Sequence, residues 1–355
     1  MTLATMLAAE DLAQYRYPLY RTSNYPRLRY MGSKYRVVPY LAYVLSDIPF
    51  DTALDAFSGS GVVGYALKEM GKQVTTNDFL NWPATVARAV IENPGVTLTM
   101  DDVETILSPT VDGRDFIRRT FDGLYFPEED HAFLDSAWSH IDQLPLYKRD
   151  LAIAALCLAA ARKQPRGVFT VTSFRYDDGR RQLRMSLRDL FLEAVAEYNA
   201  AVFDNGRDNR ALCQDVMTLD PYGYDLVYFD PPYAPPSDDA DYIKRYHFLE
   251  GLSVYWRGLT IMEDTKTKKI TKRYTPFAYK TRVRQALREL FSRFRKSTIV
   301  LSYSTNSVPD EHELYEILKG EKAEVEVYSV PHTYTFGTHE AAERRRVSEL
   351  IFVAR

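Results

Sequence analysis

Features that define several common protein classes are scarce in this sequence. It holds two cysteines in 355 residues, Cys157 and Cys213, both in apolar surroundings and without metal-type spacing. We therefore expect two buried free thiols rather than a disulfide, which suits a reducing cytoplasm. The six histidines are scattered, and none pairs with another histidine or a cysteine at ligand spacing. Because zinc sites need such clusters, no structural metal is expected.

Long apolar runs are missing as well. The longest helix-like apolar stretch, Leu151 to Ala161, is too short to cross a bilayer. Residues Met1 to Tyr20 lack the basic patch followed by an apolar run that marks a secretion signal. We therefore expect a cytoplasmic protein without a membrane partner. The apolar fraction of 46% is still ample for a buried core, and the length suits one large domain or two ordinary ones.

The chain has little net charge, only −3, so its total charge does not predict a polyanionic partner. The distribution of charge is more informative. Eight lysines or arginines lie between Arg162 and Arg188 against two acids, and twelve lie between Lys266 and Lys296 against Glu289 alone. A local basic surface is what contacts with phosphates require, whatever the total charge. Two solvated surface faces remain the alternative interpretation.

The first hundred residues predict a nucleotide-binding unit. A strand over Thr52 to Ala56 runs into the small-residue turn Ser58-Gly59-Ser60-Gly61, and a helix follows to Met70. The next strand, Gln73 to Thr76, ends at Asn77-Asp78. A strand, a glycine turn, a helix and a strand with an acid at its tip form the βαβ arrangement that binds nucleotides.

The rest of the chain predicts one sheet built from two separate stretches. Helical patterns dominate from about residue 100 to 210, and strands resume at Ala211 to Cys213 and Leu226 to Phe229. We expect a doubly wound, mostly parallel α/β sheet formed by residues 1–100 and 211–355, interrupted by a mostly helical insertion over residues 101–210. The remaining predicted elements are helices at Val37–Ser46, His131–Ile141, Tyr147–Lys163, Ser186–Phe203, Val283–Phe294 and Glu311–Leu318, and strands at Ser297–Tyr303, Glu324–Ser329 and Val347–Ala354.

The glycine turn leaves room for a cofactor to lie against the backbone. Gly59, Gly61 and Gly64 also satisfy the G-x-G-x-x-G spacing of nicotinamide-binding enzymes. Asp55 counts against that interpretation, because a carboxylate at the end of the strand would repel a pyrophosphate. The same carboxylate suits a cofactor with an amino acid ammonium group, and Asp78 suits ribose hydroxyls. S-adenosylmethionine is therefore the leading candidate, and a tight turn without a ligand is the alternative.

Asp230-Pro231-Pro232-Tyr233 follows the apolar strand Leu226 to Phe229 and predicts the catalytic centre. Two prolines stiffen the turn, so the Asp230 carboxylate and the Pro231 carbonyl point in a set direction. An aromatic amine is a poor nucleophile, because its lone pair is delocalised into the ring. Two acceptors that hold its hydrogens favour a tetrahedral nitrogen that attacks a sulfonium methyl in line. Tyr233 offers a face for stacking, and a base in a duplex must be flipped out to reach it.

These motifs resemble the Dam-like, alpha-group adenine-specific DNA methyltransferases from about Arg29 to the C-terminus. The family's opening Tyr-x-Gly-Gly-Lys stands here as Tyr30-Met31-Gly32-Ser33-Lys34, and its acid-Pro-Phe-x-Gly-x-Gly motif as Asp55 to Gly61. Ser33 replaces the second glycine and Ala56 the proline, and both keep a small residue. The catalytic tetrapeptide is unaltered, and the motif order also agrees.

The resemblance implies roles for individual residues. The cofactor's methionine end would contact Tyr30, Gly32 and Lys34, and Asp78 would hold its ribose. Asp215 would pair with the cofactor's adenine amine, with Val216 packed beside it. The cofactor pocket would be lined by Asp55, Phe57, Ser58, Gly59, Ser60 and Gly61.

The same resemblance gives the insertion the task of reading double-stranded DNA. The segment from Arg166 to Arg188, with its Asp-Asp-Gly turn, is a candidate hairpin that enters a groove. The basic, aromatic stretch Lys266 to Lys280 is a candidate loop that orders on DNA, and residues 247–250 are expected to start a flanking helix used in packing. The candidate DNA contacts are Arg166, Arg175, Arg180, Arg181, Arg184, Lys272 and Arg273.

Other functions stay open at this point. A methyltransferase with the same fold could act on RNA or on protein glutamine, and a relative could bind DNA without catalysis. The long insertion and the intact catalytic turn favour a site-specific DNA methyltransferase of bacterial, archaeal or phage origin. A cognate restriction endonuclease is a further candidate partner.

Overall fold

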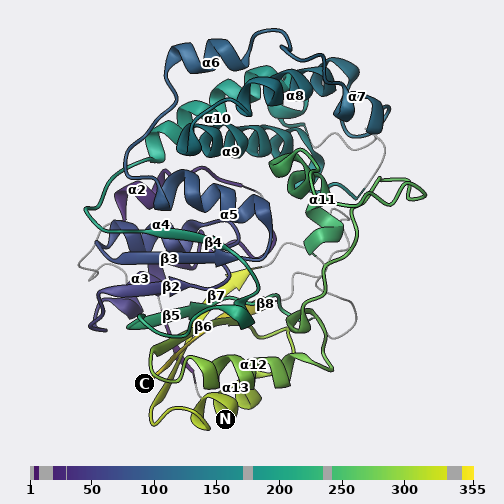
Figure 1. Cartoon of the computed structure of the whole chain (residues 1–355). Coiled ribbons are helices and arrows are strands. Elements are labelled where there is room, and N and C mark those ends of the chain that lie inside the picture. The colour runs from purple at the N-terminus through teal and green to yellow at the C-terminus, as the bar shows by residue number, and fades with distance from the viewer. Residues whose placement is uncertain (1–3, 8–18, 29, 171–178, 235–241, 334–345) are drawn as a thin grey trace.

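A single eight-stranded sheet forms the centre of the protein in a computed structural model that describes residues 4–7, 19–28, 30–170, 179–234, 242–333 and 346–355 (Figure 1). The strand order is β1-β7-β8-β6-β5-β2-β3-β4. Only β8 runs antiparallel to its neighbours in this described part, so the predicted doubly wound, mostly parallel α/β sheet is confirmed. The strands are β1 (Thr5–Met6), β2 (Thr52–Asp55), β3 (Gln73–Asp78), β4 (Arg210–Cys213), β5 (Leu226–Phe229), β6 (Thr298–Ser304), β7 (Val325–Thr333) and β8 (Arg346–Ala354).

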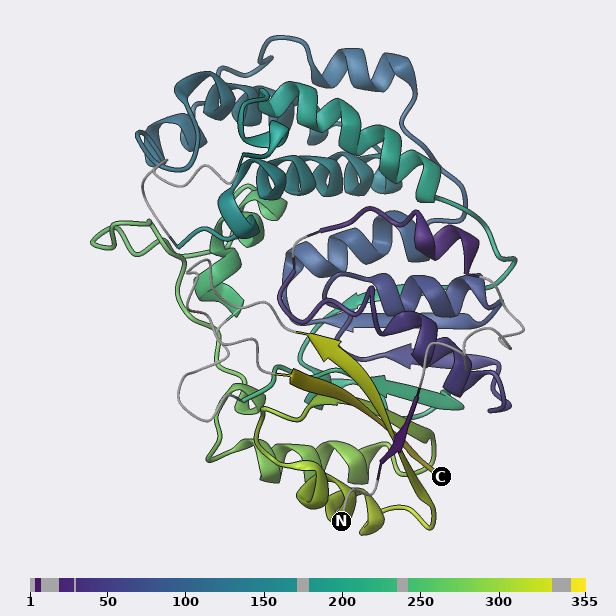
Figure 2. The same ribbon diagram turned by 180° about the vertical axis from the view of Figure 1, so that it is seen from behind.

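Helices cover both faces of the sheet, as expected for buried parallel strands. Side chains alternate along each strand, so in β2 Ala53 packs into one core and Leu54 into the other. The first core includes α3 (Val38–Leu45), α4 (Val62–Glu69) and α5 (Asn81–Ala87). The second includes α12 (Val283–Arg293) and α13 (Glu311–Lys319). Seen from behind, β1 lies at the sheet edge beside β7 (Figure 2).

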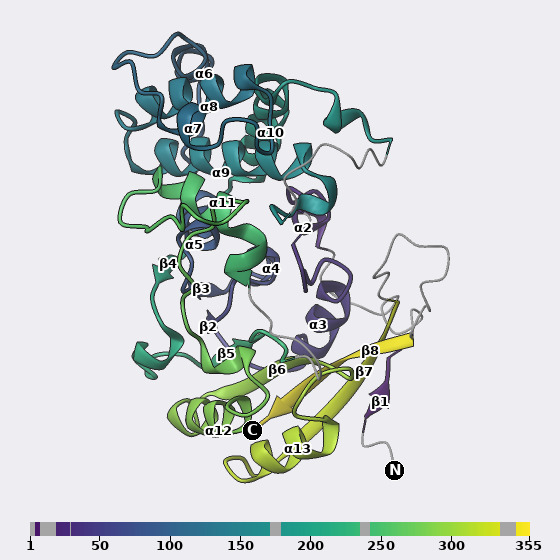
Figure 3. The same cartoon turned by 90° about the vertical axis from the view of Figure 1, so that its right-hand side faces the viewer.

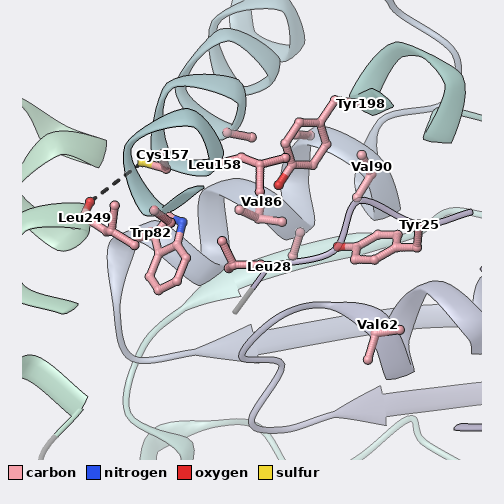
Figure 4. Packing of buried hydrophobic residues seen from close by; sticks show 14 of the residues in the cluster. Tyr25, Leu28, Val62, Trp82, Val86, Val90, Cys157, Leu158, Tyr198 and Leu249 are labelled. Carbon is pink, nitrogen blue, oxygen red and sulfur yellow. Dashed lines mark hydrogen bonds between the residues drawn. The ribbon is translucent and has the colours of Figure 1, made fainter. Parts of the chain in front are cut away.

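A group of helices stacks on the face that α4 and α5 cover (Figure 3). Helix α9 is buried along most of its length and packs on α5, so one apolar core joins this group to the sheet. Figure 4 shows part of that joint, where Cys157 of α9 donates to the Leu249 carbonyl (3.8 Å) near Trp82. The helices of the group are α6 (Met100–Ile106), α7 (Phe116–Thr120), α8 (Glu128–Ile141), α9 (Leu146–Lys163) and α10 (Leu187–Ala201).

Helix α11 (Tyr242–Val254) lies between the helical group and the sheet (Figure 1). Phe248 packs against Phe121, and the Tyr255 hydroxyl donates to Asp135 (2.5 Å), so this later part of the chain also contacts the group. The division into domains at residues 101 and 211 stays a prediction. The remaining elements are the short helix α2 (Tyr20–Ser23), the π turn Arg88–Glu92, and 3-10 turns at Pro165–Gly167, Arg181–Leu183, Val216–Thr218 and Pro276–Ala278.

Two expectations are corrected. Cys157 is buried, but Cys213 is exposed, because it ends β4 at the edge of the sheet. The expected hairpin arms are not strands where the structure describes them: residues 168–170 have no regular structure, and Arg181–Leu183 is a 3-10 turn. At the start of this turn, the Arg180 guanidinium donates to the carbonyls of Arg162 and Gln164, which ties the segment to the end of α9. Residues 171–178 lie outside the described part.

Two features are absent from the residues that the structure describes. None of their helices combines the length and the apolar character that crossing a bilayer requires. Within the same ranges, no three histidine, cysteine or acidic side chains gather as metal ligands do.

Candidate active site

The two principal motifs meet at one edge of the sheet. Strand β2 pairs in parallel with β3 and β5, with Asp55 opposite Thr76 and Tyr228, so the carboxyl ends of all three strands share that edge. The glycine turn after β2, the tip of β3 and the turn after β5 therefore line one cleft, as the rule for such sheets predicts. Its lining includes these predicted residues: Tyr30, Gly32, Lys34, Asp55, Phe57, Ser58, Gly59, Ser60, Asp78, Asp230 and Pro232.

The glycine turn is built from positive backbone angles that favour glycine. Gly59 has a φ of 48° and Gly61 a φ of 79°. A Cβ at Gly61 would lie 2.6 Å from the hydroxyl oxygen of Tyr25, which donates to the Ser60 carbonyl at 2.9 Å. Gly61 is thus required for packing against Tyr25 and does not line the cleft. A Cβ at Gly59 would lie 3.0 Å from Tyr30 Cε1, so the Tyr30 ring rests on the turn.

Asp55 presents an unpaired oxygen in the cleft. Its side chain is fully buried, and Oδ2 accepts a hydrogen bond from the Gly64 amide at 2.9 Å. Oδ1 has no partner among the described residues, and the buried Ser58 hydroxyl also lacks one there. Burial, with the nearby Asp230 carboxylate, raises the pKa of Asp55 to about 8. A buried acceptor that is costly to ionise alone suits a ligand with a cationic or N–H donor group.

Asp78 ends β3 and holds the glycine turn. Its Oδ2 accepts from the Gly59 amide at 2.9 Å, and its Oδ1 accepts from the Leu80 amide at 3.0 Å. Burial raises the pKa of Asp78 to about 6, although both amide bonds lower it. Each carboxylate oxygen can accept more than one hydrogen bond, so hydroxyls of a ligand can still donate to Asp78.

An aromatic cluster fixes Tyr30 at the mouth of the cleft. The Tyr30 ring stacks on Tyr246 with centroids 5.1 Å apart, and Trp82 and Tyr242 lie 5.6 and 5.5 Å away. The Tyr246 hydroxyl accepts a hydrogen bond from the Met31 amide at 2.7 Å, which ties helix α11 to the opening motif. Helix α11 therefore positions the opening motif, a role that the sequence did not reveal.

A buried lysine balances the charge of Asp230 in the catalytic turn. Lys34 Nζ lies 2.7 Å from Asp230 Oδ2 and donates to the Gly32 carbonyl at 2.8 Å. The Lys34 side chain is only 4% exposed, whereas that of Asp230 is 17% exposed. Burial raises the pKa of Asp230 to about 6, Lys34 opposes that rise, and the Glu349 carboxylate adds to it. Lys34, predicted to contact the cofactor, thus lines the cleft and is also the counterion of Asp230.

Tyr233 is held on both sides in this conformation. Its hydroxyl lies 2.7 Å from Asp230 Oδ1 and 2.5 Å from Glu349 Oε1. Lys34 Nζ lies 4.9 Å from the centre of its ring, and the Tyr303 ring lies 4.7 Å from it. The predicted stacking of a target base on Tyr233 therefore requires that the ring or its neighbours shift.

Glu349 and Glu250 are two residues whose importance the sequence analysis missed. Glu349 belongs to β8, is 1% exposed and contacts the catalytic turn. Its signal was a lone acid directly before the apolar run Leu350 to Ala354. Glu250 was assigned to packing, but its carboxylate accepts from the Asn81 and Trp82 amides, both at 3.0 Å. It therefore caps the first turn of α5 beside Asp78.

Asp215, Val216 and Pro231, like Gly61 and Tyr233, are not among the residues that line the cleft. Asp215 is exposed and accepts from the Met217 amide at 2.9 Å, which caps the following 3-10 turn. Val216 is buried in the core that contains Leu54. The Gln214 amide donates to the Asp78 carbonyl, so this segment adjoins Asp78. Pro231 is buried within the catalytic turn.

Three of the predicted DNA-binding arginines, Arg180, Arg181 and Arg184, have side chains that the structure describes. Arg180 donates to the carbonyls of Arg162 and Gln164, both at 3.1 Å, and Arg181 pairs with Glu193 at 2.7 Å. Arg184 is exposed. The backbone of Arg166 lies in a 3-10 turn, and Arg175 lies outside the described residues.

Lys272 and Arg273 adjoin the catalytic turn. They line a second hollow, which shares Phe79, Pro232 and Tyr242 with the cleft. Arg273 donates to the Phe79 carbonyl at 2.5 Å and lies 5.0 Å from the centre of the Phe79 ring. The Lys272 ammonium lies 5.2 Å from the centre of the Tyr279 ring, which stacks on the exposed Tyr274. This part of the basic stretch therefore places cations and aromatic faces beside Pro232.

Comparison with known proteins agrees with this geometry. Residues 30–317 match the family model of the D12 class N6 adenine-specific DNA methyltransferases. The matched range contains the opening motif, the glycine turn and the catalytic turn, and it ends before β7 and β8.

Three curated proteins are similar over more than nine-tenths of this chain. The type II methyltransferase M2.HphI of Haemophilus parahaemolyticus is 29% identical over 93% of this chain and 98% of its own length. The modification methylase StsI of Streptococcus sanguinis is 23% identical over 92% of this chain. The type II methyltransferase M.FokI of Planomicrobium okeanokoites is 24% identical over 92% of this chain. This chain spans about half the length of the last two, 51% and 52%.

Proposed function

The chain belongs to the D12 class N6 adenine-specific DNA methyltransferase family, and from this we propose that its cleft binds S-adenosylmethionine and presents the methyl group to an amine that Asp230 holds. Within the family, we assign it to the Dam-like, alpha-group subclass. The motif order supports that assignment, because the lysine-containing opening and the glycine turn both precede the catalytic turn. The observation that carries the proposal is the meeting of the glycine turn and the Asp230 turn in one cleft.

The residues present fit this cofactor. Oδ1 of Asp55, which accepts no hydrogen bond from the described residues, is a site for the ammonium of its methionine part, and the Ser58 hydroxyl is a second polar group without a partner among those residues. Asp78 can accept hydrogen bonds from ribose hydroxyls at the tip of β3. Phe57, which packs edge-on against Phe277, gives the cleft an apolar wall. The bound cofactor supplies an electrophilic methyl group on a sulfonium.

Asp230 and the Pro231 carbonyl orient the target amine of adenine. When they accept its two hydrogens, the nitrogen lone pair turns toward the methyl carbon. The bound cofactor would supply the methyl carbon for a new carbon–nitrogen bond, and the electrons of the broken carbon–sulfur bond would stay on sulfur. The nitrogen then loses one proton to the Asp230 carboxylate. Because 17% of this side chain stays exposed, the proton can pass to water.

The base reaches the cleft by flipping out of the duplex, since a paired adenine cannot approach Asp230. Lys272 and Arg273 adjoin Pro232, so they are placed to hold phosphates next to the flipped nucleotide. We assign sequence reading to the insertion over residues 101–210, with Arg184 among its exposed cations. Residues 1–100 and 211–355 form the catalytic domain in this assignment.

A restriction endonuclease that reads the same DNA sequence is the partner we propose. Two of the three similar proteins are named type II methyltransferases, and the third is named a modification methylase. The chain itself is proposed to supply only the protecting methylation.

Label transfer from S-adenosylmethionine tests the proposal. Duplex DNA, ribosomal RNA and bulk protein are offered in separate reactions, and the methylated product is identified after digestion. Label in N6-methyldeoxyadenosine alone is the expected result. Label confined to RNA or protein would refute the choice of substrate, and absence of cofactor binding by calorimetry would refute the choice of cofactor.

A further inference from the structure

Two tyrosines in the stretch between α11 and α12, Tyr274 and Tyr279, form a stacked pair that we call the tyrosine platform (Figure 1). Their ring centroids are 5.4 Å apart, and the angle between the ring planes is 23°. Tyr274 is 62% exposed, so Tyr279 covers only part of it and another flat ring can still stack on it. Single exposed aromatic side chains are common on protein surfaces, so exposure alone does not indicate a ligand.

Buried contacts fix the platform beside the cofactor cleft. Its two tyrosines flank the 3-10 turn Pro276–Ala278. Phe277 of that turn is 1% exposed and packs edge-on against Phe57 of the cleft lining, with ring centroids 5.3 Å apart. Tyr279 lines the second hollow, which shares Pro232 of the catalytic turn with the cleft. The platform is therefore held in place next to the catalytic turn before any substrate binds.

The surroundings of the platform are cationic. Residues 266–282 hold seven lysines and arginines and no acid. The Lys272 ammonium lies 5.2 Å from the centre of the Tyr279 ring, and the described lining of the second hollow contains Lys272 and Arg273 but no acid. A surface that combines cations with an open aromatic ring suits a polyanion that carries flat rings, which is the chemistry of nucleic acid.

Base flipping creates the ring faces that such a platform needs. In an intact duplex each base is stacked between its neighbours, so its faces are closed to a side chain. When the target adenine leaves the stack, the bases on either side of the gap and the base left unpaired each expose a face. These bases are also the nearest to the catalytic turn, because the flipped adenine lies in the cleft.

We propose that Tyr274 is a base-stacking residue of the DNA site: its exposed ring stacks on a base that the flip uncovers next to the target adenine. Tyr279 supports the ring from the other side. Stacking on a side chain replaces part of the stacking that the flip removes, so Tyr274 stabilises the flipped complex. This inference rests on the proposed DNA methylation, and it adds a contact with a base to the phosphate contacts proposed for Lys272 and Arg273.

The variants Tyr274→Phe and Tyr274→Ala separate stacking from loss of the tyrosine hydroxyl. Phenylalanine keeps the flat ring, whereas alanine removes it. With unmethylated DNA as substrate, kcat/KM for DNA is expected to stay within about threefold of the original value for phenylalanine and to fall about tenfold or more for alanine. The affinity for S-adenosylmethionine, measured by calorimetry without DNA, should be unchanged in both variants.

Tyr222→Ala is the matched control. Tyr222 is 63% exposed, and the Lys296 ammonium lies 5.0 Å from the centre of its ring, so it is also an open ring beside a cation. It precedes the amino end of β5, whereas the catalytic turn follows the carboxyl end of that strand. Tyr222→Ala should therefore keep the kcat/KM of the unaltered protein.

Salt dependence and fluorescence supply readouts that a charge contact or a merely structural role would not give. A neutral ring releases no counterions, so the slope of log affinity against log salt should be the same in Tyr274→Ala as in the unaltered protein. The three tryptophans of the chain are buried, so the exposed ring in Tyr274→Trp has a distinct emission. That emission should be quenched by a duplex that carries the methylated sequence context, whereas the emission of Tyr222→Trp should not change.

The outcomes distinguish this inference from the proposed function. An unchanged kcat/KM in Tyr274→Ala, equal losses in the alanine and phenylalanine variants, or no quenching in Tyr274→Trp would overturn the inference while leaving DNA methylation intact. Absence of methylation by the unaltered protein would refute the proposed function, and the inference would fall with it. Thermal unfolding of each variant shows whether a lost rate reflects lost folding, and little loss is expected at so exposed a side chain.

Discussion

Lys34 Nζ lies 2.7 Å from Asp230 Oδ2, although 196 positions separate the two residues in the chain. This ion pair joins the opening motif to the catalytic turn. It explains how a half-buried aspartate can stay ionised beside a second acid, Glu349. Through this pair, the charge of Lys34 in the opening motif acts directly on Asp230 in the catalytic turn.

Replacing Lys34 by methionine should move the acid limb of the methyl-transfer rate to higher pH. The cation holds the pKa of Asp230 down against burial, so its loss raises that pKa, and Asp230 stays protonated and inactive over a wider range. The limb should rise by about one to three pH units, as measured in single turnovers. Lys148→Met is the control, because it removes another partly buried lysine–aspartate ion pair, that of Lys148 with Asp102. An unmoved acid limb would contradict the role of Lys34.

Cofactor affinity should depend on the ionisation of Asp55. Its pKa is raised to about 8, so at neutral pH the free protein holds this carboxyl mostly protonated. A cationic ligand binds the ionised form, so affinity should grow by up to about tenfold per pH unit as the pH rises toward 8, and then level off. Calorimetry of S-adenosylmethionine binding measures this. Asp55→Asn should lose both the affinity and its pH dependence, and the exposed Asp208→Asn should lose neither. A pH-independent affinity in the unaltered protein would refute the ammonium site.

Gly61→Ala should damage the cleft more than strain alone predicts. Gly61 and Gly71 have nearly equal φ values, 79° and 77°, but a Cβ at Gly71 meets nothing within 4 Å. Gly71→Ala should therefore cost only the left-handed backbone strain, about 1–2 kcal/mol. Gly61→Ala adds a clash with Tyr25 and should also weaken cofactor binding. Equal losses of unfolding free energy with unchanged cofactor affinity would contradict the account.

Arg273→Ala should weaken DNA binding and reduce its dependence on salt. If Arg273 neutralises one phosphate, the slope of log affinity against log salt should fall by about one. Binding titrations at several salt concentrations measure this. Arg207→Ala is the control, because exposed Arg207 binds the carbonyl of Gly71 just before β3, at the amino end of that strand. An unchanged slope would remove Arg273 from the DNA interface.

Local patterns predicted the elements well, because each depends on neighbouring residues. The glycine turn, the strand before Asp230 and the helix after Ser186 all lie where the sequence places them. Contacts between distant segments were not predictable in this way. Glu349 meets Tyr233 across 116 positions, and only the placement of β8 next to β6 brings them together.

The segment that we expect to read DNA shows the opposite limit. Its β-forming composition predicted a hairpin, but most of that composition lies in residues 171–178, outside the described part, and only the described Arg181–Leu183 is a 3-10 turn rather than a strand. The contact of Arg180 with the carbonyls of Arg162 and Gln164 joins two segments and could not be predicted from local propensity. The exposure of Cys213 was not predictable either, since only the strand order shows that β4 is an edge.

We propose that Asp230 directs methyl transfer to the N6 amine of adenine in DNA. The most direct measurement is the content of N6-methyldeoxyadenosine, by mass spectrometry with methylation-sensitive sequencing, in DNA from a methylation-deficient host that expresses the protein or its Asp230→Ala variant. We predict N6-methyladenine in one recurring sequence context with the unaltered protein and none with the variant, which should still bind S-adenosylmethionine. Equal methylation in both, or a methyl group on another base, would contradict the claim.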